Sequence, residues 1–155
     1  MTGAERIDRA TRFVPAAAKD IYRAFIDPDQ LIRWLPPAGM AGRVHAFEPR
    51  EGGRYRIELT YLGAGRGKSG ARSDMTEGRF MALVPDREIV WSVIFQSDDE
   101  AFQGEMTMRW TFRPEDGGTR VDIACSDVPP GISAEDHAAG MGSTLDNLAG
   151  FMAAR

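Results

Sequence analysis

The chain has 155 residues, 43% of them hydrophobic and 27% charged, with a formal net charge of -4 at pH 7. This is the size and composition of one globular domain with a buried core, so we expect a single domain over residues 1–155. The acidic balance and the absence of a basic stripe exclude nucleic acid as the expected partner.

Hydropathy along the chain bears on its location. The N-terminal residues lack the apolar core of a signal peptide. No apolar run approaches the roughly 18 residues that a membrane span requires. The sequence therefore predicts a cytoplasmic protein without a membrane span.

The first predicted elements are a strand and a short helix. Residues 7–14 read as a strand. Pro15 then precedes a helix over residues 16–26, whose apolar face carries Ile21 and Phe25.

A second short helix is predicted directly after the first. Asp27 is placed as its N-cap, Pro28 as its first residue and Gln30 at the third position of a capping box. Its apolar side carries Leu31, Trp34 and Leu35. The two prolines at residues 36–37 end this helix.

After Gly39 the hydrophobic period changes from helical to two, which indicates strands. The expected strands cover residues 43–48, 54–62, 75–84, 88–96, 104–113 and 119–126. Because the connections are short, neighbouring strands should pair antiparallel and form a meander with one apolar face.

A long helix is predicted over residues 133–154, with Ser133 as its N-cap. Its apolar stripe consists of His137, Met141, Leu145, Leu148 and Met152. Gly140, Gly142 and Gly150 each cost about 1 kcal/mol relative to alanine in a helix. The helix should therefore depend on packing against the sheet, and the glycines would permit a close backbone approach or leave room for a ligand.

The order and spacing of several segments match a known pattern. These segments are AFIDPDQLIRWLPPAGM, Gly52-Gly53, LVPDREIVW, GGTRV and a final helix that begins SAEDHAAGM. Together they cover nearly the whole chain, and the chain resembles the activator of heat-shock-protein-ninety ATPase homologue-like family. That family belongs to the START or birch-pollen-allergen-like (SRPBCC) helix-grip superfamily.

The resemblance implies an α+β helix-grip fold. In this fold a strongly bent antiparallel sheet of about seven strands wraps around a long C-terminal helix, and two short helices follow strand one. The resemblance also implies an apolar cavity between sheet and helix, in which members commonly bind hydrophobic small molecules. Members often have Gly-Trp in the final helix, whereas this chain has Gly140-Met141, which should change the shape of the cavity. The eukaryotic co-chaperones carry an extra domain for which this chain has no length, so a co-chaperone function is not carried over.

The expected ligand-binding side chains are those on the apolar faces that meet inside the grip. They combine aromatic rings, which can orient a ligand through one polar atom, with methionines, which adapt to variable shapes. Part of the set must also serve plain core packing. The predicted ligand-binding residues are Trp34, Met40, Tyr55, Ile57, Leu59, Trp91, Phe95, Met106, Met108, Trp110, His137, Met141 and Leu145.

Few residues offer other chemistry. His45 and His137 are the only histidines and no Cys/His cluster exists, so we expect no metal site and no cofactor. His137 could hydrogen-bond a ligand or act as an acid or base, although a histidine satisfied at the end of the core is the favoured interpretation. Cys125 is interpreted as a buried structural thiol. Glu58 and Glu105 are expected on the solvated face of the sheet.

The glycine-rich stretch over residues 63–73 does not support nucleotide binding. Its Gly67-Lys68-Ser69 lacks the spacing of a phosphate-binding loop, and no helix follows to present its N-terminus. We interpret the stretch as a hairpin loop, with gating of the cavity mouth as the alternative.

Three functions remain open from the sequence. The leading one is a protein that binds an apolar or amphipathic small molecule in the cavity between sheet and helix. The alternatives are a polyketide cyclase or aromatase-like enzyme, with His137 or Tyr55 as its acid or base, and a solid-core interaction module that uses the outer sheet face. A binding protein is favoured over an enzyme, and both a monomer and a homodimer are compatible with the sequence.

Overall fold

The computed structural model describes residues 6–62, 73–95 and 98–155. The elements are β1 (Ile7–Val14), α1 (Ala18–Ile26), α2 (Pro28–Trp34), β2 (Met40–Phe47), β3 (Arg54–Tyr61), β4 (Ser73–Val84), β5 (Glu88–Phe95), the 3-10 turn η2 (Glu100–Phe102), β6 (Gly104–Glu115), β7 (Gly118–Ser126) and α3 (Ala134–Ala154). None of the helices in these ranges has both the length and the apolar character needed to cross a bilayer.

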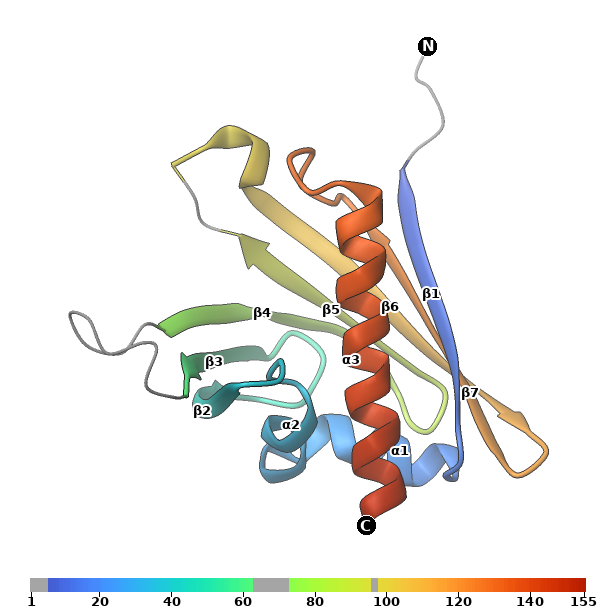
Figure 1. The fold of residues 1–155 in the computed structure, drawn as a ribbon. Coiled ribbons are helices and arrows are strands. Elements are labelled where there is room, and N and C mark those ends of the chain that lie inside the picture. The colour runs from blue at the N-terminus through green and yellow to red at the C-terminus, as the bar shows by residue number, and fades with distance from the viewer. Residues whose placement is uncertain (1–5, 63–72, 96–97) are drawn as a thin grey trace.

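The strands form one antiparallel sheet in the order β1-β7-β6-β5-β4-β3-β2. Strands β2 to β7 follow one another as a meander, and β1 pairs with β7 at the far edge. Figure 1 shows the sheet bent around α3, with α1 and α2 beneath the C-terminal half of that helix. The structure thus confirms the predicted α+β helix-grip fold with seven strands and two short helices after strand one.

The sheet bends where β4 changes its pairing partner. Residues 73–79 of β4 pair with β3, whereas residues 80–84 pair with β5. A register shift between Phe80 and Ala82 marks a bulge at the change. Beyond it, within the described chain, the first half of β4 and the end of β5 have no ladder between them and diverge (Figure 1).

The predicted helix caps are confirmed, except for the capping box at α2. The Ser133 side chain accepts a hydrogen bond from the Asp136 backbone N–H at 3.0 Å, and the Asp27 carboxylate accepts one from the backbone N–H of Asp29 at 3.0 Å. Gln30, however, donates its side-chain amide to the Asp27 carboxylate at 3.1 Å. The predicted capping box is wrong because the Asp27 backbone N–H already donates to the carbonyl of Arg23, where it closes α1.

The predicted start of β2 is also corrected, because β2 begins at Met40 rather than residue 43. Gly39 turns the chain with a φ of 85°, and Met40 then pairs with Tyr61 of β3. A Cβ at Gly42 would lie 3.1 Å from the Pro36 side chain, so the glycine lets β2 approach the end of α2. Backbone pairing thus extends into residues too small to show the period of two.

Candidate functional site

The thirteen predicted ligand-binding residues all lie in the described chain, and most share one hydrophobic cluster. Eight of them are buried inside this cluster: Trp34, Tyr55, Ile57, Trp91, Met106, Trp110, Met141 and Leu145. Leu59, Phe95 and Met108 are partly buried and pack against it. Met40 and His137 are half-buried and are not part of this cluster. The structure therefore brings eleven of the thirteen predicted side chains together between the sheet and the helices.

The centre of the cluster is an aromatic base that the predicted set captured only in part. Phe25 of α1 lies at its middle, with ring centroids 4.8 Å from Trp34, 4.9 Å from Trp110 and 5.7 Å from Trp91. Phe112 completes the packing at 5.4 Å from Phe25. The signals for Phe25 and Phe112 were present, since both stand on predicted apolar faces. In this part of the molecule the rings fill the space against one another.

Two polar atoms of the aromatic base are bonded to the backbone. The Trp34 indole N–H donates to the carbonyl of Ala24 at 3.0 Å and ties α2 to α1. The Tyr55 hydroxyl donates to the carbonyl of Ser92 at 2.6 Å, where β4 and β5 diverge. Burial raises the pKa of Tyr55 far above its usual range, so its hydroxyl stays protonated and acts as a donor. This removes Tyr55 as a catalytic base.

Two further indoles have less usual surroundings. The Trp91 N–H lies 3.3 Å from the sulfur of Met108, a weak acceptor. The Trp110 N–H is buried and has no hydrogen-bond partner among the described residues. An unmet donor in an apolar core costs stability, so Trp110 is held for its ring rather than for its polar atom.

A second, more open part of the inner face lies at the strand ends opposite β1. Met40 begins β2, Leu59 lies near the end of β3 and Phe95 ends β5, and all three remain half-buried. The backbone of α3 lies close to β1 and α2. Contact between α3 and the strands farther from β1 is therefore made through the side chains of the hydrophobic cluster.

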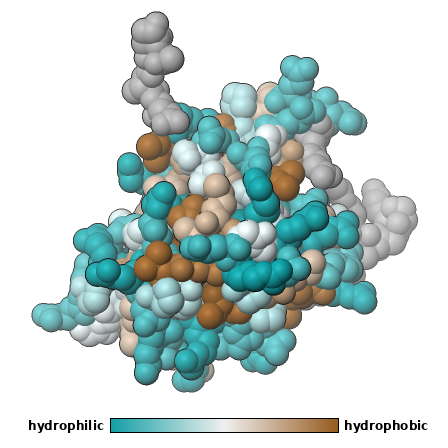
Figure 2. Space-filling model, turned by 180° about the vertical axis from the view of Figure 1, so that it is seen from behind, coloured by the Kyte–Doolittle hydropathy of each residue, from teal (hydrophilic) through white to brown (hydrophobic). Residues whose placement is uncertain are grey.

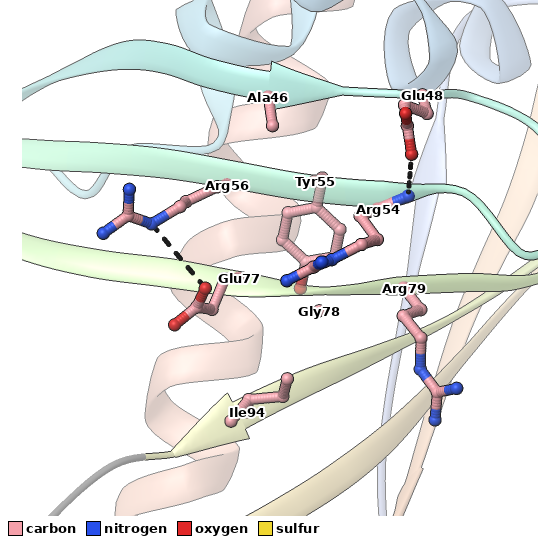
Figure 3. A pocket seen from close by; sticks show the side chains of 9 residues that line it. All are labelled: Ala46, Glu48, Arg54, Tyr55, Arg56, Glu77, Gly78, Arg79 and Ile94. Carbon is pink, nitrogen blue, oxygen red and sulfur yellow. Dashed lines mark hydrogen bonds and ion pairs between the residues drawn. The ribbon is translucent and has the colours of Figure 1, made fainter.

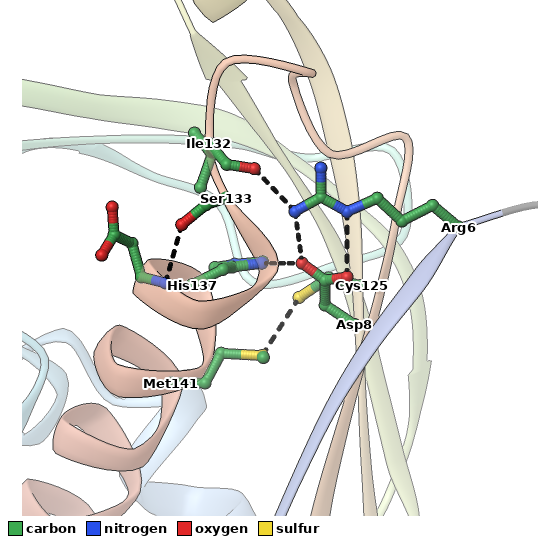
Figure 4. Close-up of polar contacts among 8 residues, drawn as sticks. Arg6, Asp8, Cys125, Ile132, Ser133, His137 and Met141 are labelled. Atoms are coloured by element: carbon green, nitrogen blue, oxygen red, sulfur yellow. Dashed lines mark hydrogen bonds and ion pairs between the residues drawn. The ribbon is translucent and has the colours of Figure 1, made fainter.

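A compact polar cluster fastens the N-terminal end of α3 to β1 (Figure 4). Arg6 makes a forked contact with Asp8, with Nε 3.0 Å from Oδ1 and Nη2 2.8 Å from Oδ2. The same Nη2 donates to the carbonyl of Ile132 at 2.7 Å. The Nδ1 atom of His137 lies 2.7 Å from Oδ2 of Asp8.

The carboxyl group of Asp8 is ionised in this cluster. The hydrogen bond from Arg6 lowers its pKa most, and the bond with His137 lowers it further, against the opposing effect of burial. His137 is a candidate from the sequence alone, but nothing in the sequence indicates Arg6 or Asp8 as its partners. The contact joins residues 129 positions apart, so it depends on β1 lying beside α3.

Cys125 lies next to this cluster, with Sγ 3.8 Å from the sulfur of Met141. The side chain is buried, and burial raises the pKa of its thiol to about 12. A thiol that stays protonated is a poor nucleophile, and the burial of Cys125 agrees with the prediction of a buried thiol.

The outer face of the sheet carries a hollow of about 460 Å³ where β4 and β5 diverge (Figure 3). It is lined by Ala46, Glu48, Arg54, Tyr55, Arg56, Glu77, Gly78, Arg79 and Ile94. Two of its arginines form ion pairs: Arg56 lies 3.7 Å from Glu77, and Arg79 lies 3.3 Å from Glu105, which is outside the lining. Figure 2 views the molecule from the side opposite to Figure 1, and there hydrophilic residues cover most of the outer face, with apolar ones scattered between them. The arrangement is that of a solvated, ion-paired surface.

The remaining predicted features have plain outcomes. Glu58 pairs with His45 at 2.8 Å on the outer face, as expected for a solvated carboxylate. Among the described residues no group of three His, Cys, Asp or Glu side chains could hold a metal ion. The glycine-rich stretch lies outside the described residues up to residue 72, so its proposed gating is not addressed by the structure.

A bent antiparallel sheet closed by a long C-terminal helix, with an apolar inner face, defines the helix-grip class. The family model described as Activator of Hsp90 ATPase homolog 1-like protein matches residues 15–153. The chain therefore belongs to this family.

Solved structures show the same fold. A crystal structure of a Chromobacterium violaceum protein is 29% identical over 94% of this chain and 96% of that chain, with a TM-score of 0.80. A Rhodobacter sphaeroides protein is 24% identical over 98% of this chain and 95% of that chain, with a TM-score of 0.79. An AHSA1-like protein from Aeromonas hydrophila is 18% identical over 96% of this chain and 93% of that chain, with a TM-score of 0.76. No curated protein matches the sequence.

Proposed function

We propose that this protein binds an apolar or amphipathic small molecule between the bent sheet and α3. The observation that carries the proposal is the group of half-buried apolar side chains on the inner face, Met40, Leu59, Phe95 and Met108. Apolar surface that stays partly open inside a concave face is the usual setting of a small-molecule site.

The packing of the inner face suggests two roles within the predicted set, core packing for some residues and ligand contact for others. The rings of the aromatic base around Trp34, Trp91 and Trp110 pack against one another and form one wall of the inner face. The half-buried residues above it are flexible or lie at strand ends, where side chains can repack around a guest. The family resemblance agrees with this use of the fold but does not name a ligand.

A pair of tryptophan substitutions tests the proposal. Leu59→Trp would fill the open part of the inner face, whereas Met81→Trp adds the same ring at the bulge of β4, where Met81 is 48% exposed. Binding of the fluorescent probe 1-anilinonaphthalene-8-sulfonate is measured for both variants and the parent. We expect Leu59→Trp to weaken binding about tenfold, equivalent to about 1.4 kcal/mol, and Met81→Trp to leave it unchanged. Equal binding by all three proteins would show that the probe does not use the inner face.

An enzyme of the same fold is the second candidate, and the contact between Asp8 and His137 is the observation that favours it. A carboxylate that orients a histidine is the arrangement used for general acid–base chemistry. The two candidates differ in their response to His137→Gln. In an enzyme this change abolishes turnover, whereas in a binding protein it alters affinity alone.

A further inference from the structure

We propose that His137 forms the polar end of the binding site and accepts a hydrogen bond from a hydroxyl group of the ligand. Arg6 and Asp8 act as positioning residues that hold the imidazole in the required tautomer. This inference rests on the proposed function and deepens it by naming the ligand's polar group.

His137 lies at the N-terminal end of the apolar stripe of α3. It lies in the first turn of α3, four residues before Met141 and eight before Leu145, on the stripe that faces the sheet. Its side chain is only 13% exposed, and that of Asp8 only 7%. His137 is therefore the one titratable member of an otherwise apolar stripe, placed at its end.

The tautomer is fixed by the hydrogen bonds of the cluster. Both oxygens of Asp8 accept from Arg6, and Oδ2 also faces Nδ1 of His137 at 2.7 Å. An ionised carboxylate offers only lone pairs, so Nδ1 must carry the hydrogen in this contact. In the neutral imidazole, Nε2 is then left as an acceptor. Because Arg6 also holds the carbonyl of Ile132, the chain leading into α3 is fastened to the same carboxylate.

The Nε2 atom of His137 determines which polar group of a ligand can bind. Within the described ranges, Nδ1 is the ring atom of His137 that has a hydrogen-bond partner, and Nε2 has none. A ligand hydroxyl can donate to Nε2, whereas a carboxylate would oppose its lone pairs to that nitrogen and add a negative charge near Asp8. A hydrogen-bonding atom that a bound ligand covers discriminates against ligands that cannot pair with it. The geometry therefore favours an amphipathic alcohol or phenol over the corresponding acid.

Two matched probes test this preference, 2-naphthol and 2-naphthoate, titrated by calorimetry at pH 7.5. They share the same bicyclic ring, and the first presents a hydroxyl where the second presents a carboxylate. We expect the parent protein to bind 2-naphthol at least about tenfold more tightly. His137→Phe should abolish this preference by weakening 2-naphthol alone. His137→Gln, whose amide oxygen can accept a hydrogen bond, should restore part of it.

The positioning role has its own measurements. Asp8→Asn should reduce the preference for 2-naphthol to an intermediate level, and the outer-face control His45→Gln should leave it unchanged. Nitrogen-15 NMR of the parent protein reads the tautomer directly, without any ligand. The inference requires hydrogen on Nδ1 and none on Nε2, and hydrogen on Nε2 would overturn it even if a variant failed to fold.

The outcomes separate the inference from the proposed function. Equal affinity for both probes, or an unchanged preference in His137→Phe, overturns the role of His137 and leaves inner-face binding intact. If the folded parent binds neither probe nor 1-anilinonaphthalene-8-sulfonate, the proposed function fails, and this inference fails with it.

Discussion

Trp110 is the residue on which the aromatic base depends most. It is fully buried, with Phe25 at 4.9 Å and Trp91 at 5.8 Å between ring centroids. We expect Trp110→Ala to lower the free energy of unfolding by roughly 3–5 kcal/mol, because a large cavity is left in a packed core. Chemical denaturation followed by circular dichroism measures the loss. A much smaller loss would indicate that Trp110 borders open space rather than packed core.

The unmet indole N–H of Trp110 allows a finer comparison. Trp110→Phe removes a donor that has no partner, whereas Trp34→Phe removes a donor that holds the carbonyl of Ala24. Both lose similar ring volume, so we expect Trp34→Phe to be the more destabilising by about 1 kcal/mol. The reverse order would mean that the Trp110 N–H has a partner, such as a buried water.

Asp8 should make stability depend on pH. Its pKa is lowered in the folded protein, so its contribution is fully present above its unfolded pKa of about 3.9 and is lost as the pH falls through the folded pKa. The stability difference between the parent and Asp8→Asn should therefore shrink as the pH falls below about 4. Denaturant titrations across the acid range measure it. A difference that stays constant would show that Asp8 is not ionised in the cluster.

At the scale of elements, the glycines of α3 do not make a close contact with the sheet. A Cβ at Gly140, Gly142 or Gly150 would meet nothing within 4 Å. Gly140→Ala should accordingly stabilise the protein by about 0.5–1 kcal/mol, because alanine restricts the unfolded chain and favours the helix. Thermal unfolding compares it with the control Gly78→Ala. There the new Cβ would lie 1.9 Å from the carbonyl oxygen of Ser92, so strong destabilisation is expected. Destabilisation by Gly140→Ala would mean that α3 needs this position flexible.

The elements show how far local pattern reaches. Alternation located the strands well, and the cap at Ser133 was readable because it needs only neighbouring residues. The prediction of a capping box at Gln30 is wrong because the Asp27 N–H donates to the Arg23 carbonyl of the preceding helix. The start of β2 at Met40 could not be predicted because the small residues Ala41 and Gly42 show no alternation of polar and large apolar side chains.

The candidate site was predictable in part for the same reason. Periodicity identifies which side chains face inward, and it placed eleven of the thirteen residues in or against one cluster. It cannot tell a filled base from an open region, since that depends on how α1 packs Phe25 against the sheet. Nor can it join Asp8 to His137, because their contact exists only once β1 lies beside α3.

At the scale of the whole molecule, the bend at β4 and the position of α3 create one inner face with two regions. The aromatic base next to α1 and α2 contains the largest fully buried side chains, those of Trp34, Trp110 and Phe25. The region at the far strand ends, with Met40, Leu59 and Phe95, keeps apolar surface half-buried. Under the proposed function, the first region would supply stability and the second would hold the guest molecule.

Native mass spectrometry of the protein purified from its own host shows whether a small molecule occupies the space between the sheet and α3. We expect the parent and Met81→Trp to carry a small molecule that solvent extraction releases, and Leu59→Trp to carry less of it. The released compound should be apolar or amphipathic. The same bare mass for all three folded proteins, or the same bound compound in equal amount on all three, would contradict binding between the sheet and α3.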